Sequence, residues 1–152
     1  MTYEDQVLLI HRGLHKKLAP GLWSCVGGHL EEGELNDPTA ACLREIEEET
    51  GIVKSDIAAL NLRYMTIRQV ERDIGVPEIS IAYYFIGQLA RLPSLIETPE
   101  GTLHFVDKAQ LLAHPMGYSV GQVAQHWLNT PQDAVLLFAV GANNQSGTWV
   151  RL

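Results

Sequence analysis

The sequence predicts an α/β (α+β) layered sandwich, in which a mixed β-sheet is flanked by helices. Short apolar segments of strand type recur along the chain, and amphipathic stretches of helical length lie between them. Such an alternation is typical of a sheet covered by helices. The 152 residues include 46% hydrophobic and 19% charged residues, which suits one packed core. We therefore expect residues 1–152 to form a single domain.

Two strands are expected near the start of the chain. Val7–Ile10 is continuously apolar, as buried strands are. Leu22–Val26 has a strand-like pattern that ends at two glycines. Residues 13–21 are rich in Gly, Lys and His, and residues 28–38 contain several turn formers, so both segments are expected to be loops.

A helix is expected over residues 38–50. Asp37 suits the N-cap, and Pro38 suits the first helical position because its fixed φ is already helical. Gly51 suits the position just beyond the helix, where a left-handed backbone is common. These signals are local, so they predict both ends of the helix.

The second half of the chain begins with an expected β-hairpin. Leu62–Val70 and Glu78–Leu89 are strand-like segments separated by turn-forming residues. Leu103–Val106 is expected to be a short strand, and Asp107 to cap a short helix that ends at Leu112.

The chain is expected to end with a helix and two paired strands. Ser119 is expected to cap a helix that runs through Asn129. Ala134–Val140 and Thr148–Leu152 are expected to pair around the glycines of residues 141–147.

Composition limits the classes of function. Lys and Arg number 11 against 18 Asp and Glu, a net charge of −7, so a long nucleic acid is a poor partner. No apolar run approaches the roughly 20 residues of a membrane helix, and no secretion signal opens the chain. Cys25 and Cys42 are too few for a disulfide framework, so we expect small buried side chains and a cytoplasmic protein.

Three carboxylates share one arc of the expected helix. At 100° per residue, Glu45, Glu48 and Glu49 lie within about 100° of one another. They lie beside an expected core stripe, and Glu47 lies on the other side. Arg44 lies at the edge of the acidic arc. The stripe consists of Thr39, Cys42, Leu43, Ile46 and Thr50.

This arc has two interpretations. A solvated acidic face is the simpler one, but glutamates near the C-terminal end of a helix are disfavoured by its dipole. Carboxylates about 5 Å apart also repel by roughly 3 kcal/mol per pair at an effective dielectric of 20. A divalent cation would relieve both effects, and all-oxygen ligands suit Mg²⁺ or Mn²⁺. The arc therefore predicts a metal site.

Residues 28–52 resemble the Nudix box, G-x5-E-x7-R-E-U-x-E-E-x-G-U with U aliphatic. All nine fixed positions are filled, and the later hairpin and the Phe105–Asp107 segment are also similar to those of Nudix domains. A Nudix-like fold is therefore implied for nearly the whole chain. The matching residues are Gly28, Glu34, Arg44, Glu45, Ile46, Glu48, Glu49, Gly51 and Ile52.

The chain departs from the box at one place, and its start differs from that of Nudix domains. Nine residues separate Glu34 from Arg44 instead of seven, and we expect the two extra residues in the loop Leu35–Asp37. The alternative is a bulge within the helix, between Thr39 and Leu43, which would rotate the later carboxylates away. Nudix domains also carry a strand ahead of the one at Val7–Ile10. Here that strand position is expected to be short, empty or filled by a partner chain, as in a homodimer.

The resemblance implies a hydrolase that cleaves a nucleoside diphosphate linked to some moiety X, with a small nucleotide-type substrate and no membrane partner. Glu45, Glu48 and Glu49, with the carbonyl of Gly27, would hold the metal. Arg44 and Glu34 would orient the carboxylates. The expected catalytic residues are Glu45, Glu48, Glu49, Arg44 and Glu100, and the expected substrate-binding residues are Arg12, Gly28 and Glu34.

Several assignments within the resemblance stay open. Glu100 is preferred over Glu97 as the glutamate outside the box that helps to deprotonate water. Arg12, with His11 and His15 nearby, either contacts phosphate or is an ordinary surface charge. Aromatic residues of the expected strands either stack on a base or belong to the core: Trp23, Tyr64, Tyr83, Tyr84 and Phe85.

Two other functions compete with nucleotide hydrolysis. A binding or sensor module for a nucleotide or ADP-ribose would use the fold without turnover, but the intact box counts against it. RNA 5′-end processing is disfavoured by the acidic charge balance.

Overall fold

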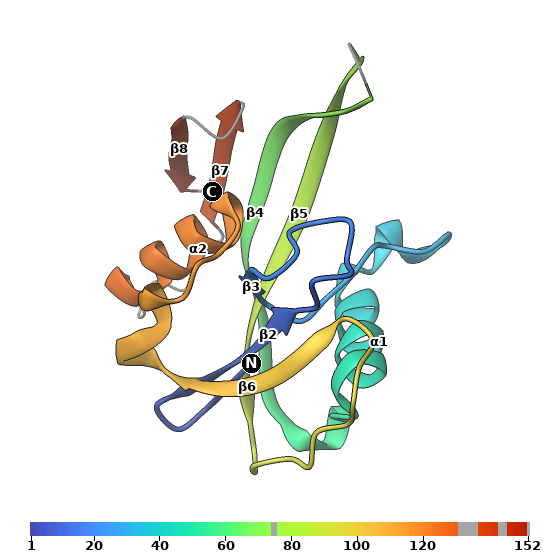
Figure 1. Cartoon of the computed structure of the whole chain (residues 1–152), viewed down its shortest axis with the longest axis vertical. Helices are drawn as coiled ribbons and strands as arrows, with labels where there is room; N and C mark the ends of the chain where they lie inside the picture. Colours follow the sequence, from blue (N-terminus) through green and yellow to red (C-terminus); the bar gives the residue numbers. More distant parts are fainter. Residues whose placement is uncertain (74–75, 131–136, 143–145, 152) are drawn as a thin grey trace.

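The computed structural model describes residues 1–73, 76–130, 137–142 and 146–151. Within these residues, eight strands form one mixed sheet, in the order β3-β2-β1-β5-β4-β7-β8, and β6 pairs with β2. This architecture confirms the predicted mixed sheet with flanking helices (Figure 1). The strands are β1 (Thr2–Tyr3), β2 (Gln6–Arg12), β3 (Trp23–Ser24), β4 (Ile57–Asp73), β5 (Val76–Leu89), β6 (Gly101–Asp107), β7 (Leu137–Ala142) and β8 (Ser146–Arg151). The helices are η1 (Glu34–Asn36), α1 (Pro38–Thr50), η2 (Lys54–Asp56), η3 (Lys108–Ala113) and α2 (Tyr118–Asn129), where η denotes a 3₁₀ helix.

Helices α1 and α2 cover opposite faces of the sheet (Figure 1). Strand β2 lies between them, and side chains alternate along a strand. Leu8 therefore packs with Ile46 of α1, whereas Val7 and Leu9 pack in the cluster that includes Trp127 of α2. Burial on both faces explains why residues 7–10 are continuously apolar.

The strand that precedes β2 is short, as expected. Strand β1 contains only Thr2 and Tyr3, which pair antiparallel with Val7 and Gln6 of β2. Its other neighbour is β5, with a parallel register of Thr2 opposite Gln88. Two residues thus join the β2–β6 side of the sheet to the long β4–β5 hairpin.

Helix α1 has the bounds that its capping signals predict. It runs from Pro38 to Thr50, and Gly51 adopts the left-handed conformation with φ 75°. The Asp37 carboxylate accepts the backbone N–H of Ala40 at 3.0 Å. The helix is continuous, so the alternative of a bulge within it is wrong.

The Asp37 cap supports a stability prediction. Asp37→Ala leaves the Ala40 N–H without its acceptor, so we expect the free energy of unfolding to fall by about 1 kcal/mol. Asp37→Asn keeps an acceptor oxygen and should stay close to the wild type. Urea denaturation measures both variants, and equal losses in the two would contradict the role of the cap.

Other expectations about the elements need correction. Strand β3 has two residues rather than the five of Leu22–Val26. Asp107 does precede a helix, but the helix is 3₁₀ and the Asp107 carboxylate instead accepts a hydrogen bond from the side chain of Gln6 at 3.2 Å. Helix α2 begins one residue before Ser119 and its N-cap is Gly117, so Ser119 is not its cap.

The remaining elements agree with expectation. The β4–β5 hairpin is longer than predicted but keeps its position, and β7 pairs antiparallel with β8. The expected strand residues 134–136 and Leu152 lie outside the described residues. Within the described part of the chain, no helix is long and apolar enough to cross a membrane.

Candidate functional site

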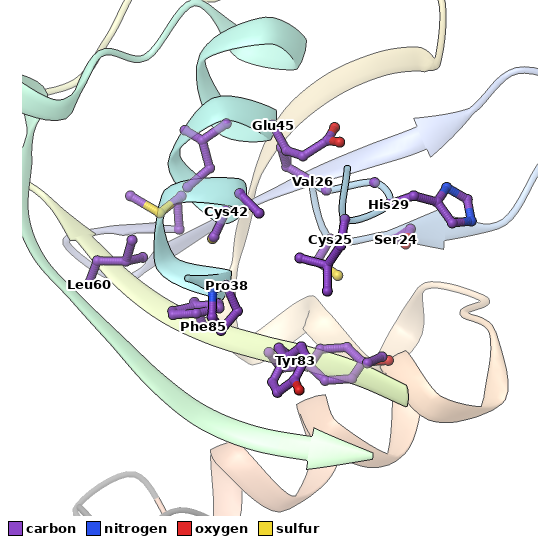
Figure 2. A pocket seen from close by; sticks show the side chains of 18 of the residues that line it. Ser24, Cys25, Val26, His29, Pro38, Cys42, Glu45, Leu60, Tyr83 and Phe85 are labelled. Atoms are coloured by element: carbon purple, nitrogen blue, oxygen red, sulfur yellow. The ribbon is translucent and has the colours of Figure 1, made fainter. Parts of the chain in front are cut away.

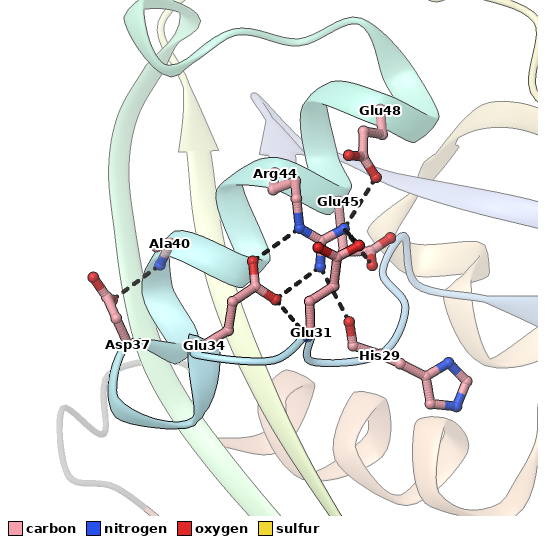
Figure 3. A network of polar contacts seen from close by, with 8 residues as sticks. All are labelled: His29, Glu31, Glu34, Asp37, Ala40, Arg44, Glu45 and Glu48. Atoms are coloured by element: carbon pink, nitrogen blue, oxygen red, sulfur yellow. Dashed lines mark hydrogen bonds and ion pairs between the residues drawn. The ribbon is translucent and has the colours of Figure 1, made fainter.

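Arg44 is the centre of a polar network between α1 and the loop that precedes it (Figure 3). Its guanidinium donates two hydrogen bonds to the Glu34 carboxylate, both at 2.9 Å. It also donates to Glu45 at 2.9 Å and to Glu48 at 3.0 Å. A further hydrogen bond reaches the backbone carbonyl of His29 at 3.1 Å. One arginine therefore joins two glutamates of the helix to the loop.

The paired arginine changes the acidity of Glu34. Hydrogen bonds from Arg44, and then from the backbone N–H of Glu31, lower the Glu34 pKa to about 2. The same contact with Glu34 raises the pKa of Arg44 above its ordinary value. Glu34 and Arg44 are thus both charged at neutral pH. Their bidentate ion pair fixes the loop on the helix.

The segment in which the two extra residues are expected, Leu35–Asp37, overlaps a short helical turn. Residues 34–36 adopt the 3₁₀ helix η1, and the N–H of Asp37 donates to the carbonyl of Glu34 at 2.9 Å. This turn ends before α1 begins. Placing the insertion in the loop is therefore consistent with an unbroken α1 and with the Arg44–Glu34 contact.

The acidic arc is present on α1 as its helical periodicity predicts. The side chain of Glu48 is 57% exposed, whereas that of Glu45 is only 16% exposed. A Cβ on Gly28 would lie 2.5 Å from the Glu45 carboxylate, so a larger residue here would displace that side chain from its present position. Glu47 is exposed, as expected for the other side of the helix.

The core stripe of α1 needs one correction. Ile46 and Thr50 are buried, and Cys42 and Leu43 are half-buried, but Thr39 is exposed. In the first turn the buried residue is instead Ala41, which is 4% exposed.

Glu49 is the most perturbed acid of the arc. Burial raises its pKa to about 7, and the negative charges of Glu45 and Glu100 add to the effect. A hydrogen bond from the Gly27 N–H, at 2.9 Å, and the charge of Arg12 act in the opposite direction. Negative charge is therefore concentrated around this carboxylate, which favours a cationic ligand.

The chemistry of these donors fits a hard cation, but their arrangement does not form a closed cluster. Within the described residues, no three His, Cys, Asp or Glu side chains are grouped so as to hold a metal ion. Glu45 and Glu48 contact Arg44, and Glu49 contacts the N–H of Gly27, the residue whose carbonyl was expected as a ligand. Carboxylate oxygens are the ligands that Mg²⁺ and Mn²⁺ prefer.

Glu100, rather than Glu97, lies among the expected site residues. Its carboxylate contacts the Lys16 ammonium at 2.5 Å and the Arg12 guanidinium at 3.6 Å. Glu97 is exposed on the same connection. Sequence reasoning did not single out Lys16, although the Gly-, Lys- and His-rich composition of residues 13–21 was a signal for it.

The two histidines near Arg12 contact backbone carbonyl groups of neighbouring segments. The His11 ring stacks on Trp23 with the ring centroids 4.9 Å apart, and its Nε2 lies 3.2 Å from the carbonyl oxygen of Gly21. His15 Nε2 lies 3.1 Å from the carbonyl oxygen of Pro99. Both contacts hold the loop of residues 13–21 against its neighbours.

A pocket of about 520 Å³ opens beside the acidic arc. It lies between α1, the loop of residues 27–34 (the glycine-rich loop) and β5. Figure 2 shows Tyr83 and Phe85 of β5 on the side opposite Cys25 and Val26. Cys25 is exposed, so the expectation that it is buried is wrong, and Cys42 is half-buried. The lining includes Cys25, Gly28, Cys42, Glu45, Tyr83 and Phe85.

The aromatic residues divide between core and pocket. Tyr64 has no exposed surface and packs with Val123 of α2, so it belongs to the core. Trp23 packs against the rings of three histidines, which are His11, His104 and His114. Tyr83 and Phe85 line the pocket, where an aromatic ring of a ligand can stack, whereas Tyr84 borders the pocket but also packs in the cluster of Tyr64 and Val123.

Comparison with protein families gives one match over most of the chain. A model of the NUDIX domain matches residues 1–126. Nudix hydrolase 25 of Arabidopsis thaliana is 45% identical over 40 residues. That stretch covers 26% of this chain and 22% of the plant protein, so the match spans about a fifth of the relative's length.

Solved structures share the fold at low sequence identity. A MutT protein from Bacillus halodurans has a TM-score of 0.74 at 22% identity, over 99% of this chain and 92% of that one. The dihydroneopterin triphosphate pyrophosphohydrolase of E. coli has a TM-score of 0.64 at 21% identity, over 83% and 87%. The NUDIX domain of Shewanella oneidensis NrtR, complexed with ADP ribose, has a TM-score of 0.61 at 18% identity, over 84% and 78%.

Proposed function

Because the chain belongs to the Nudix family, we propose that it hydrolyses the pyrophosphate bond of a nucleoside diphosphate linked to a moiety X, with Mg²⁺ or Mn²⁺ as cofactor. Nucleoside triphosphates, including oxidised ones, fall within this class. The observation that carries the proposal is the acidic arc of Glu45, Glu48 and Glu49, held to the glycine-rich loop through Arg44 and Glu34.

The chemistry explains why acids surround a site for an anionic substrate. A phosphoanhydride repels nucleophiles, and divalent cations neutralise this charge and lower the pKa of bound water. Glu45, Glu48 and Glu49, with the Gly27 carbonyl, are the residues that would hold the cations. Arg44 already contacts two of these acids and would keep them oriented.

Residues outside the helix would act on the substrate and the nucleophile. We assign Arg12 to a phosphate, because its guanidinium lies beside Glu100 at the rim of the acidic region. We assign Glu100 to accepting a proton from the attacking water. Gly28 leaves room for the Glu45 carboxylate against the loop, and we assign its backbone to the substrate side of the site.

The pocket beside Glu45 is the proposed site of the nucleobase or of X. Its volume of about 520 Å³ suits a small molecule. Tyr83 and Phe85 provide aromatic surface, and Glu45 lies at the side where phosphates would meet the acids. The names of the structural neighbours include a pterin triphosphate hydrolase and an ADP-ribose complex, which supports a nucleotide-type ligand.

A substrate panel tests this function. Nucleoside triphosphates, oxidised nucleotides, nucleotide sugars, ADP-ribose and dinucleoside polyphosphates are incubated with the protein and Mg²⁺. Release of phosphate or pyrophosphate is measured directly, or after a phosphatase for products that are monophosphates. We expect at least one class to be hydrolysed. Binding of ADP-ribose or a nucleotide without turnover of any compound would favour the sensor module instead.

Three further assignments accompany the proposed function. We propose that residues 1–152 form one Nudix domain, since the family model and the MutT structure together cover nearly the whole chain. The cytoplasm remains the proposed location because the structure contains free cysteines. A homodimer also remains a prediction. Strand β1 has two residues and pairs with β5 only at Thr2 and Gln88, so a partner chain could add a strand beside it.

A further inference from the structure

Lys16 is a cation of the candidate site that lies outside the Nudix box. Its ammonium contacts one oxygen of Glu100 at 2.5 Å, while Arg12 lies 3.6 Å from the other. The Lys16 side chain is only 23% exposed. Both oxygens of the proposed proton acceptor are thus paired with cations.

Backbone contacts hold Glu100 next to Arg12, and the N–H of Lys16 is also bonded, to the carbonyl of Gly13 at 3.1 Å. The N–H of Gly13 donates to the Glu100 carbonyl at 3.0 Å, and Arg12 lies opposite Gly101 at the end of the β2–β6 ladder. A Cβ on Gly101 would lie 2.1 Å from the carbonyl oxygen of His11, so only glycine allows this approach.

The Arg12 side chain is also anchored, because its Nε donates to the carbonyl of Leu18 at 3.0 Å. Lys16 differs, since its charge lies at the end of a flexible four-carbon stem. Of the two cations on Glu100, Lys16 is therefore the one best able to change partner.

The surrounding charges favour such an exchange. Glu100 lies close enough to the acidic arc for its charge to contribute to the raised pKa of Glu49. A di- or triphosphate that enters this region adds further negative charge and competes with Glu100 for nearby cations. Coulomb attraction grows with the charge of the partner, so a multiply charged phosphate attracts an ammonium more strongly than one carboxylate does.

We propose that Lys16 is a phosphate-binding residue that exchanges Glu100 for the substrate phosphate, so that the Glu100 carboxylate is released when substrate binds. The release of a proton acceptor rests on the proposed function, whereas the phosphate contact does not require turnover. In the empty site Lys16 would neutralise the charge of Glu100. With substrate bound, the Glu100 carboxylate would be free to accept a proton from water.

The first test measures binding of methylenediphosphonate, a diphosphate that cannot be hydrolysed, by calorimetry in Mg²⁺. We expect Lys16→Met to raise Kd about tenfold, the loss typical of a charge-assisted hydrogen bond. Lys17→Met is the matched control, because Lys17 is the exposed neighbour, and should bind like the wild type. Lys16→Arg keeps the charge and should restore most of the binding.

Exchange of partners is tested by adding Glu100→Gln. This change removes the carboxylate that competes for Lys16. It should therefore lower the Kd of methylenediphosphonate more in the wild-type background than in the Lys16→Met background. Additive effects would overturn the exchange. A wild type that does not bind the probe, or equal Kd values for Lys16→Met and the wild type, would overturn the phosphate contact. If the wild type binds the probe but hydrolyses nothing in the panel, only the proposed function fails.

Discussion

Replacing Glu48 with glutamine is expected to lower kcat by about two to three orders of magnitude while the fold survives. The substitution keeps the shape of the side chain but removes a charge that would hold the catalytic cation. The side chain is 57% exposed and its ion pair with Arg44 lies at the surface, so its contribution to stability is small. Steady-state kinetics on a substrate from the panel, with thermal unfolding of each variant, measures both effects.

Glu47→Gln is the matched control for Glu48→Gln. The two residues are adjacent and chemically identical, but Glu47 points about 100° away from Glu48 and is exposed on the other side of α1. We expect its loss of activity to be small by comparison. Equal losses in the two variants would contradict the assignment of the acidic arc to catalysis.

Removal of divalent cations is expected to abolish activity. EDTA should reduce hydrolysis to background, and excess Mg²⁺ should restore it, because the cations neutralise the phosphoanhydride and activate water. The helix itself should persist, since Asp37 caps it and Ile46 packs it against the sheet without a metal. Circular dichroism in EDTA checks this point.

The proposed metal site also predicts how the affinity for the cation depends on a bound ligand. Crowded carboxylates partly neutralised by Arg44 should bind Mg²⁺ or Mn²⁺ weakly alone and more tightly with a phosphorylated ligand, which supplies further oxygen donors. Titration with Mn²⁺, with and without methylenediphosphonate, measures the difference. Hydrolysis that persists in EDTA would contradict the predicted need for a divalent cation.

Local features of the sequence were the most predictable. The Asp37-Pro38 start and the Gly51 end of α1 agree with the structure because caps depend on residues within one turn. The common arc of Glu45, Glu48 and Glu49 follows from helix geometry alone. The hairpin of β4 and β5 was predictable because its strands are neighbours in sequence.

Three expectations about single residues failed, one of them because a distant partner decided the outcome. Asp107 could have capped the following helix, but its carboxylate bonds to Gln6, which lies 101 residues away. Ser119 carries the right side chain for a cap, yet α2 begins earlier, at Tyr118 after Gly117. Cys25 was expected to be buried as a small apolar residue, and instead it lines an open pocket.

The sequence by itself determined the layered fold class, the helix that carries the acids and the spacing that identifies the Nudix family, because these depend on periodicity and on contacts within a few residues. Only the tertiary structure decided which cations meet Glu100. Pairing of β2 with β6 brings Arg12 opposite Gly101, and the loop after β2 then places Lys16 on a carboxylate 84 residues away. Such a contact depends on sheet register, which is decided by burial over the whole core rather than by local sequence.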